Sequence, residues 1–103
     1  MENNKISILI VEDDMIIAAN LSVQLTSLGY EVAGILPRGE EAIIHVEKNS
    51  PHLLLMDINL KGKLNGIETV KAIQKSKDIP IIYLTANSDD ATFELAKETY
   101  PMA

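Results

Sequence analysis

A run of four apolar residues, 53–56, followed at once by Asp57, constrains the fold of this chain more than any other feature. The run is too short for a helix and is typical of a strand buried on both faces, in the middle of a parallel sheet. The chain then turns polar between Asn59 and Asn65. A carboxylate at the carboxyl end of such a strand lies where open α/β sheets bind their ligands. The alternative is that Asp57 only caps the turn that follows.

Apolar runs and helical patterns alternate along the sequence. Strands are predicted over residues 6–11, 30–36, 53–57 and 79–84, and the partly polar strand 30–36 is expected near an edge of the sheet. Gly29 predicts the end of the first helix. The residues predicted to face inward are Ile17, Leu21, Leu25 and Leu28 in the first helix, Ala42, Ile43 and Val46 in the second, Ile67, Val70 and Ile73 in the third, and Phe93 and Ala96 in the fourth, which starts near Ser88. Alternation with short links implies right-handed crossovers and an α/β domain whose doubly wound parallel sheet has helices on both faces.

Composition excludes several classes of protein. A chain of 103 residues, 47% hydrophobic and 23% charged, has room for one globular domain. Its net charge of -6, with Arg38 as the only arginine, argues against a nucleic-acid surface. No apolar run approaches the roughly 20 residues of a membrane span. The absence of cysteine excludes disulfides and thiolate chemistry, and the cytoplasm is the default compartment.

Polar side chains end three of the four predicted strands: Glu12 and Asp13, Asp57, and Thr85. In a parallel sheet these ends lie at one edge, so the carboxylates should repel one another and have raised pKa values. Mg²⁺ relieves this repulsion, because it binds through a few carboxylates and water. An Asp beside Mg²⁺ can act as a nucleophile toward phosphorus, and the Thr85 hydroxyl can bond a phosphoryl oxygen.

Four segments resemble the receiver domain of two-component response regulators, in the same order and at matching spacing. They read Ile-Leu-Ile-Val-Glu-Asp-Asp, Leu-Leu-Met-Asp-Ile-Asn-Leu, Asn-Gly-Ile-Glu and Ile-Pro-Ile-Ile-Tyr-Leu-Thr-Ala. The resemblance extends from Lys5 to Pro101. It implies a flavodoxin-like fold with strand order 2-1-3-4 for the four βα units.

The resemblance also implies a role for each matching residue. Asp57 would be the phosphoacceptor, Glu12 and Asp13 the acidic Mg²⁺ pair, Asn59 a ligand through its backbone carbonyl, and Thr85 the switch hydroxyl. The chain would then be a phosphorelay signalling module and not an enzyme. Its partner would be a sensor histidine kinase or a phosphotransfer protein, and it would bind neither nucleic acid nor membrane.

The sequence departs from the family pattern in two places. The loop 60–66 lacks the usual proline and is one residue longer. A fifth strand with an aromatic residue and a phosphate-binding lysine, and a fifth helix, do not follow, so residues 1–103 are expected to be a receiver domain without its last βα unit. That leaves strand 79–84 as an open edge and exposes the first helix around Ile16, Ala19 and Val23, which predicts a homodimer or an exchanged element.

Two alternatives remain for the function. The chain could be a receiver-like interaction domain without phosphotransfer, or a small Mg²⁺-dependent phosphatase-like enzyme. An Asp two positions after Asp57 would favour a phosphatase, but Asn59 stands there. The sequence has no glycine-rich phosphate loop, so a nucleotide-binding enzyme is unsupported.

Overall fold

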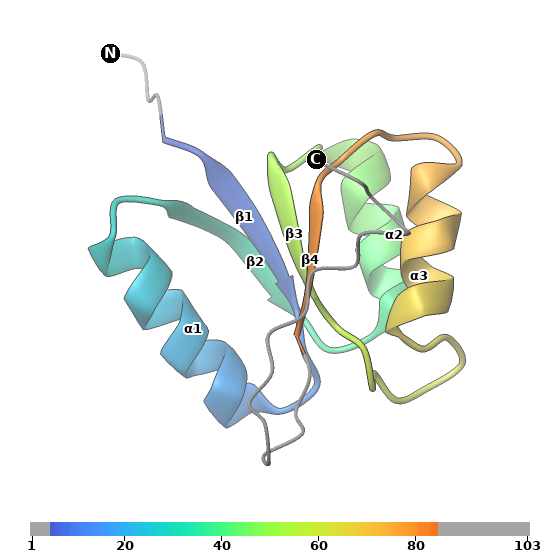
Figure 1. Ribbon diagram of the computed structural model, residues 1–103, viewed down its shortest axis with the longest axis horizontal. Coiled ribbons are helices and arrows are strands. Elements are labelled where there is room, and N and C mark those ends of the chain that lie inside the picture. The colour runs from blue at the N-terminus through green and yellow to red at the C-terminus, as the bar shows by residue number, and fades with distance from the viewer. Residues whose placement is uncertain (1–4, 85–103) are drawn as a thin grey trace.

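Short apolar segments form the strands of this chain, and the amphipathic segments between them form the helices. The computed structural model describes residues 5–84 (Figure 1). Along the chain the elements are β1 (Ser7–Val11), α1 (Met15–Ser27), β2 (Glu31–Leu36), α2 (Gly39–Lys48), β3 (Leu53–Asp57), α3 (Gly66–Gln74) and β4 (Ile81–Leu84). The predicted order of strands and helices is confirmed over this range. The predicted fourth helix, with Phe93 and Ala96, and the predicted site residue Thr85 lie outside the described residues.

The strands form one parallel sheet in the order β2-β1-β3-β4. This confirms the predicted order, including the place of β2 at an edge of the described sheet. The two central strands are in register, with Leu9 opposite Leu54 and Ile10 opposite Leu55. Since the strands run in one direction, the carboxyl ends of β1 and β3 lie side by side (Figure 1).

Helices cover both faces of the sheet, with α2 and α3 on one face and α1 on the other (Figure 1). In α2 the residues predicted to face inward do so: Ala42 and Val46 are buried and Ile43 packs beside them. The sheet residues of this larger core are Leu9, Val11, Leu54, Met56, Ile81 and Tyr83. A smaller core on the α1 face surrounds Ala18. The doubly wound α/β architecture predicted from the sequence is therefore confirmed.

Helix α1 faces the sheet with a different set of residues from the one predicted. Ala18 is fully buried, and Leu21 and Leu25 pack against the same core. Ile17 and Leu28, both predicted to face inward, are 37% and 72% exposed. Leu28 comes after the last residue of the helix, and Ala18 is the residue of α1 that is buried. The prediction for Ile17 and Leu28 is wrong.

Gly29 ends α1, as predicted. Its φ of +99° is a left-handed conformation that glycine adopts without strain. The Gly29 N–H donates to the Thr26 carbonyl at 3.0 Å, and the Tyr30 N–H donates to the Leu25 carbonyl at 3.0 Å. This pair of bonds is the Schellman motif, which satisfies the last carbonyls of a helix.

Helix α3 buries Val70 and Ile73, as predicted, but also Thr69. The Thr69 hydroxyl donates to the Asn65 carbonyl at 2.8 Å, so the buried oxygen has a partner within the helix. Ile67, predicted to face inward, is 39% exposed, and that prediction is wrong.

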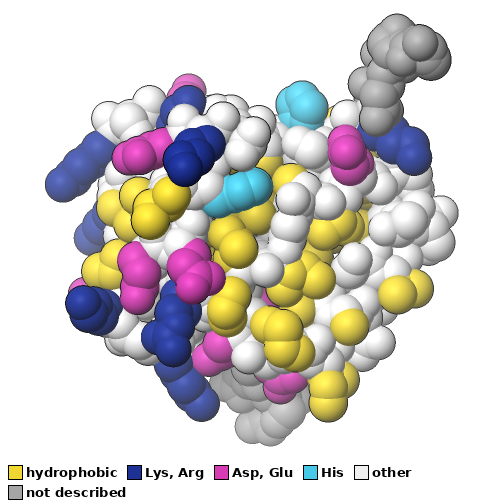
Figure 2. Space-filling view, turned by 180° about the vertical axis from the view of Figure 1, so that it is seen from behind, with side chains coloured by type: hydrophobic (Ala, Val, Ile, Leu, Met, Phe, Trp, Pro, Cys, Tyr) yellow, Lys and Arg dark blue, Asp and Glu magenta, His cyan; other side chains and the backbone are white. Residues whose placement is uncertain are grey.

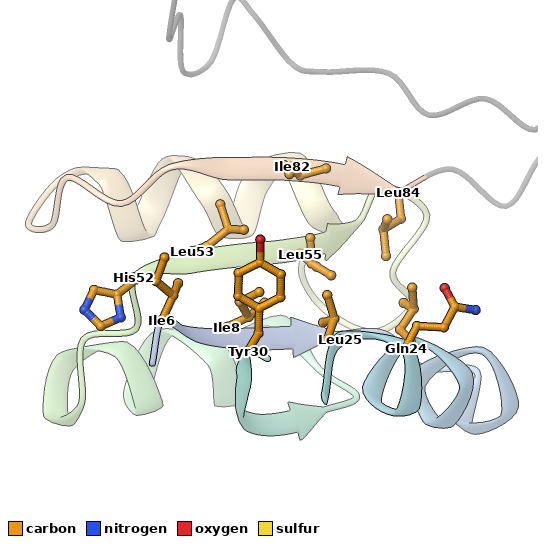
Figure 3. Close-up of a pocket in the computed structure, with 11 residues that line it drawn as sticks. Ile6, Ile8, Gln24, Leu25, Tyr30, His52, Leu53, Leu55, Ile82 and Leu84 are labelled. Carbon is orange, nitrogen blue, oxygen red and sulfur yellow. The ribbon is translucent and has the colours of Figure 1, made fainter. Parts of the chain in front are cut away.

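The α1 face of the sheet is only partly covered by residues 5–84. A cavity of about 570 Å³ lies between α1 and the sheet (Figure 3), and its lining is mostly apolar: Ile6, Ile8, Leu21, Gln24, Leu25, Tyr30, His52, Leu53, Leu55, Ile82 and Leu84. Helix α1 has no charged residue, and its outer side exposes Ile16 and Val23 at 75% and 68%. Figure 2 shows apolar side chains at the surface on the side where α1 lies. None of the helices in the described part of the chain has the length and apolar character needed to cross a membrane.

Candidate functional site

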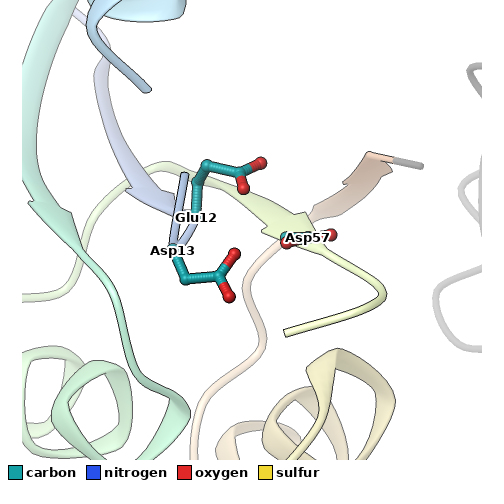
Figure 4. Close-up of side chains that lie close together, drawn as sticks. All are labelled: Glu12, Asp13 and Asp57. Atoms are coloured by element: carbon teal, nitrogen blue, oxygen red, sulfur yellow. The ribbon is translucent and has the colours of Figure 1, made fainter. Parts of the chain in front are cut away.

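Three carboxylates meet at the carboxyl edge of the sheet. Glu12 and Asp13 follow β1, and Asp57 is the last residue of β3 (Figure 4). One oxygen of each carboxylate lies within 4.8 Å of the other two. Glu12 and Asp57 are each only 3% exposed, whereas Asp13 is half-buried. The structure thus brings together the three acids that the sequence predicts at this edge.

Backbone groups hold Glu12 in the cluster. The Glu12 N–H donates to the Leu36 carbonyl at 3.0 Å, which attaches the end of β1 to β2. The Glu12 carboxylate accepts the Asp14 N–H at 3.0 Å. The Asp14 carboxylate in turn accepts the N–H groups of Ile16 and Ile17 and caps α1. The third acid of the sequence Glu12-Asp13-Asp14 therefore starts the helix, while the first two belong to the site.

Asp57 both caps a turn and belongs to the cluster, so the two interpretations of this residue do not compete. Its Oδ1 accepts the Asn59 N–H at 3.0 Å, an Asx turn that orients the carboxylate. On its other side the backbone of Asp57 lies against Gly66, where an added Cβ would sit 2.1 Å from the Asp57 carbonyl oxygen. Only glycine allows α3 to begin this close to the end of β3.

Burial and mutual repulsion change the acidity of this site. The pKa of Glu12 is raised from 4.5 to about 7. Burial is the largest cause, the Asp14 N–H opposes it, and the charges of Asp57 and Asp13 and a hydrogen bond with Asp57 add to the rise. Burial also raises the pKa of Asp57, while the Asn59 N–H and the bond with Glu12 lower it. Glu12 is therefore the acid that holds a proton most readily. Deprotonating the whole cluster costs free energy that a divalent cation would recover.

The donor set suits a hard divalent cation. All three side chains offer carboxylate oxygens, which Mg²⁺ prefers, and the half-buried Asp13 leaves the cluster accessible to water. Asn59, the predicted carbonyl ligand, is exposed and contacts Asp57 through its N–H. Its role as a carbonyl ligand stays a prediction. Thr85 follows β4 directly but lies outside the described residues.

A basic pair that the sequence pattern does not predict lies beside the acids. Arg38 and Lys61 line a pocket of about 280 Å³ together with Asp13, Pro37 and Gly62. Arg38 follows the strand β2, so its place after a predicted strand was a signal that it lies at the same edge of the sheet as Asp57. Lys61 comes from the loop between β3 and α3, whose path the sequence pattern did not predict.

The segments that build this site recur in known proteins. The family model of the response regulator receiver domain matches residues 8–99. The chain is 42% identical over 86 residues to the probable transcriptional regulator ycf27 of Porphyra purpurea, a match that covers 84% of the chain and 35% of that protein. It is 33% identical over 96 residues to the transcriptional regulatory protein PdtaR of Mycobacterium tuberculosis, covering 93% of the chain and 46% of the relative. The chain thus spans less than half the length of these curated relatives.

A solved structure supports the same assignment. The signal receiver domain of a modulated diguanylate cyclase from Desulfovibrio desulfuricans G20 superposes with a TM-score of 0.77 at 41% sequence identity, over 95% of the chain and 78% of that structure. Sequence and fold agree along nearly the whole chain. With three acids gathered at the ends of β1 and β3, the chain belongs to the response regulator receiver domain family.

Proposed function

We propose that the chain is a phosphorylation-controlled signalling module in which Asp57 accepts a phosphoryl group from a sensor histidine kinase or a phosphotransfer protein. The observation that carries the proposal is the meeting of Glu12, Asp13 and Asp57 within 4.8 Å at the end of a buried central strand. A structural role does not explain this arrangement, because like charges in a buried place destabilise the fold. A site for a cation and a phosphoryl group does explain it.

In the proposed step a carboxylate oxygen of Asp57 attacks the phosphorus of a phosphohistidine. The new O–P bond forms as the P–N bond breaks, and the imidazole nitrogen leaves with the electron pair and takes up a proton. The Asn59 N–H holds the Asp57 carboxylate in one orientation during the attack. A bound Mg²⁺ would neutralise charge on the phosphoryl oxygens, and Glu12, Asp13, Asp57 and the Asn59 carbonyl are its proposed ligands. The family resemblance gives Thr85 the role of the switch hydroxyl.

The surface next to the acids suits a protein as the phosphoryl donor. Met15 and Ile16 begin α1 directly after the acidic segment and are 51% and 75% exposed. Large exposed apolar side chains close to a reactive group are typical of a protein–protein contact. The donor would therefore be recognised through the start of α1 as well as through its phosphoryl group.

We also propose that the chain self-associates. Within the described sheet, β4 pairs with β3 alone, and an open strand edge favours pairing with another chain. Ile82 and Leu84 of this strand also line the apolar cavity under α1. A homodimer or an exchanged element at this place would bury both the strand edge and the apolar surface.

Labelling with a small phosphodonor tests the proposed function. With Mg²⁺ and acetyl phosphate, intact-mass analysis should show one added phosphoryl group, and peptide mapping should place it on Asp57. Asp57→Asn should abolish the added mass. Asp78→Asn, the same change at an exposed acid before β4, should have no effect and serves as the matched control.

Other outcomes distinguish the alternatives. An Asp57→Asn variant that still takes up one phosphoryl group would exclude Asp57 as the acceptor. Steady release of inorganic phosphate without a lasting adduct would favour a Mg²⁺-dependent phosphatase-like enzyme. No reaction with any donor would favour an interaction domain without phosphotransfer.

A further inference from the structure

The pocket beside the acidic cluster combines charges of both signs. Its lining residues come from three connections at the carboxyl edge of the sheet: Asp13 follows β1, Pro37 and Arg38 follow β2, and Lys61 and Gly62 follow β3. Its volume of about 280 Å³ accommodates a small oxyanion together with several waters. Asp13 belongs both to this pocket and to the acidic cluster, so the two sites are contiguous.

Gly62 allows Arg38 to lie across the loop between β3 and α3. The φ of Gly62 is +109°, and a Cβ added there would be 3.5 Å from Nη1 of Arg38. The guanidinium group therefore lies close to the backbone of this loop at Gly62, the residue after Lys61. The two basic side chains come from segments more than twenty residues apart in the sequence and meet at one pocket.

Within residues 5–84, neither a capping bond nor an ion pair explains the position of Arg38. It is the N-cap residue of α2, where its side chain makes no capping bond. A cation at the N-terminal end of a helix is unfavourable, because the helix dipole is positive there. In residues 5–84, neither Arg38 nor Lys61 forms an ion pair with a carboxylate. The guanidinium and the ammonium group thus bring two positive charges to one pocket, where neither is held in an ion pair within residues 5–84, although Asp13 lines the same pocket and Glu40 and Glu41 lie in the first turn of α2.

We propose that Arg38 and Lys61 form a binding site for the phosphoryl group of the incoming donor, before its transfer to Asp57. This inference rests on the proposed function and names how the donor is recognised. A guanidinium group binds two phosphate oxygens at once, and a lysine adds a point charge. Asp13 repels an anion in the pocket until its own charge is neutralised. Phosphate and Mg²⁺ therefore strengthen each other's binding, and this coupling is reciprocal.

Direct binding of inorganic phosphate tests the site without requiring phosphotransfer. Phosphate is titrated into the full chain by NMR in the presence of Mg²⁺, and the amide signals of residues 37–38 and 61–62 are followed. The double variant Arg38→Ala/Lys61→Ala should lose about tenfold or more in phosphate affinity, since one or two charge-assisted bonds are removed. Arg38→Lys should retain part of the affinity.

The matched control is Lys48→Ala, which removes an exposed lysine at the other end of the same helix and should leave phosphate affinity unchanged. Both substituted residues are exposed, so the double variant should unfold at the same urea concentration as the wild type. Phosphate affinity equal in the double variant and the wild type would overturn the proposal. So would an equal loss in Lys48→Ala, or no phosphate binding by the wild type.

The same variants separate this inference from the proposed function and identify the source of the phosphoryl group. Asp57→Asn should abolish labelling, and without Mg²⁺ it should bind phosphate as the wild type does, because Asp57 does not line the pocket. If Asp57 is labelled in the wild type but the double variant keeps its phosphate affinity, the basic site is excluded and the proposed function stands. If the double variant loses phosphate binding but Asp57 is never labelled in the wild type, the proposed function is excluded and the basic site stands. The half-saturating donor concentration for labelling Asp57 is then compared between the double variant and the wild type, with acetyl phosphate and with phosphoramidate as a P–N donor. A donor whose half-saturating concentration is higher in the double variant is one that the site binds.

Discussion

Replacing Glu12 by Gln should stabilise this protein at neutral pH. The amide keeps the size of the side chain, and its oxygen can accept the Asp14 N–H as the carboxylate does. The substitution also removes the negative charge beside Asp57, which the folded protein carries at a cost in free energy. The pKa of Glu12 rises from 4.5 in the unfolded chain to about 7 in the folded protein. At about 1.4 kcal/mol per pKa unit, the buried charge costs about 3 kcal/mol once Glu12 is ionised in both states.

The sign of the pH dependence follows from the direction of this shift. A folded-state pKa above the unfolded value means that the folded protein binds the extra proton, so the wild type loses stability as the pH rises from about 4.5 to about 7. Urea unfolding of both proteins between pH 4 and 8 measures the difference. The two free energies of unfolding should nearly coincide near pH 4, and Glu12→Gln should be more stable by about 3 kcal/mol above pH 7. A difference that is constant across this range would refute the assignment of the buried proton to Glu12.

Three further outcomes are expected. Asp13→Ala should weaken Mg²⁺ binding markedly in a calorimetric titration, whereas Asp14→Ala should leave Mg²⁺ binding nearly unchanged. Asp14→Ala should instead cost about 1 kcal/mol of stability through the lost helix cap. Equal effects of the two variants on Mg²⁺ binding would mean that the wrong acidic pair has been chosen. Gly66→Ala should destabilise the fold by about 3 kcal/mol or more in urea unfolding, because the methyl group would collide with the Asp57 carbonyl, and wild-type stability would contradict the close packing seen here. Sedimentation at micromolar concentration should show self-association, and a monodisperse wild-type monomer would exclude it.

The fold was predictable because strands and helices differ in the period of their apolar residues. The uninterrupted apolar run before Asp57 predicted a central strand, and Gly29 predicted the end of α1. The inward faces of the helices were less predictable, since small and polar residues can be buried where the apolar pattern predicts only large apolar ones. Ala18 is the fully buried residue of α1 although its side chain is small, and Thr69 is buried because its hydroxyl bonds within its own helix.

The candidate site likewise has one part that the sequence predicted and one part that it did not. Glu12, Asp13 and Asp57 were predictable because strand ends lie together in any parallel sheet, so their position in the sequence indicated their position in space. The pocket at Arg38 and Lys61 was not, because it depends on how two loops approach each other. That approach depends on the left-handed backbone of Gly62, which the sequence pattern alone does not reveal.

The bond from the Asn59 N–H to Asp57 affects how this protein can evolve. The backbone supplies the donor, so every residue except proline can provide it at position 59. The Asn59 side chain is exposed and lies two residues from the proposed acceptor. Substitutions there can alter the charge and bulk met by an attacking water while the orientation of the Asp57 carboxylate is retained. Under the proposed function, the lifetime of phosphorylated Asp57 can therefore change between descendants of this protein while the architecture that holds the acceptor is retained.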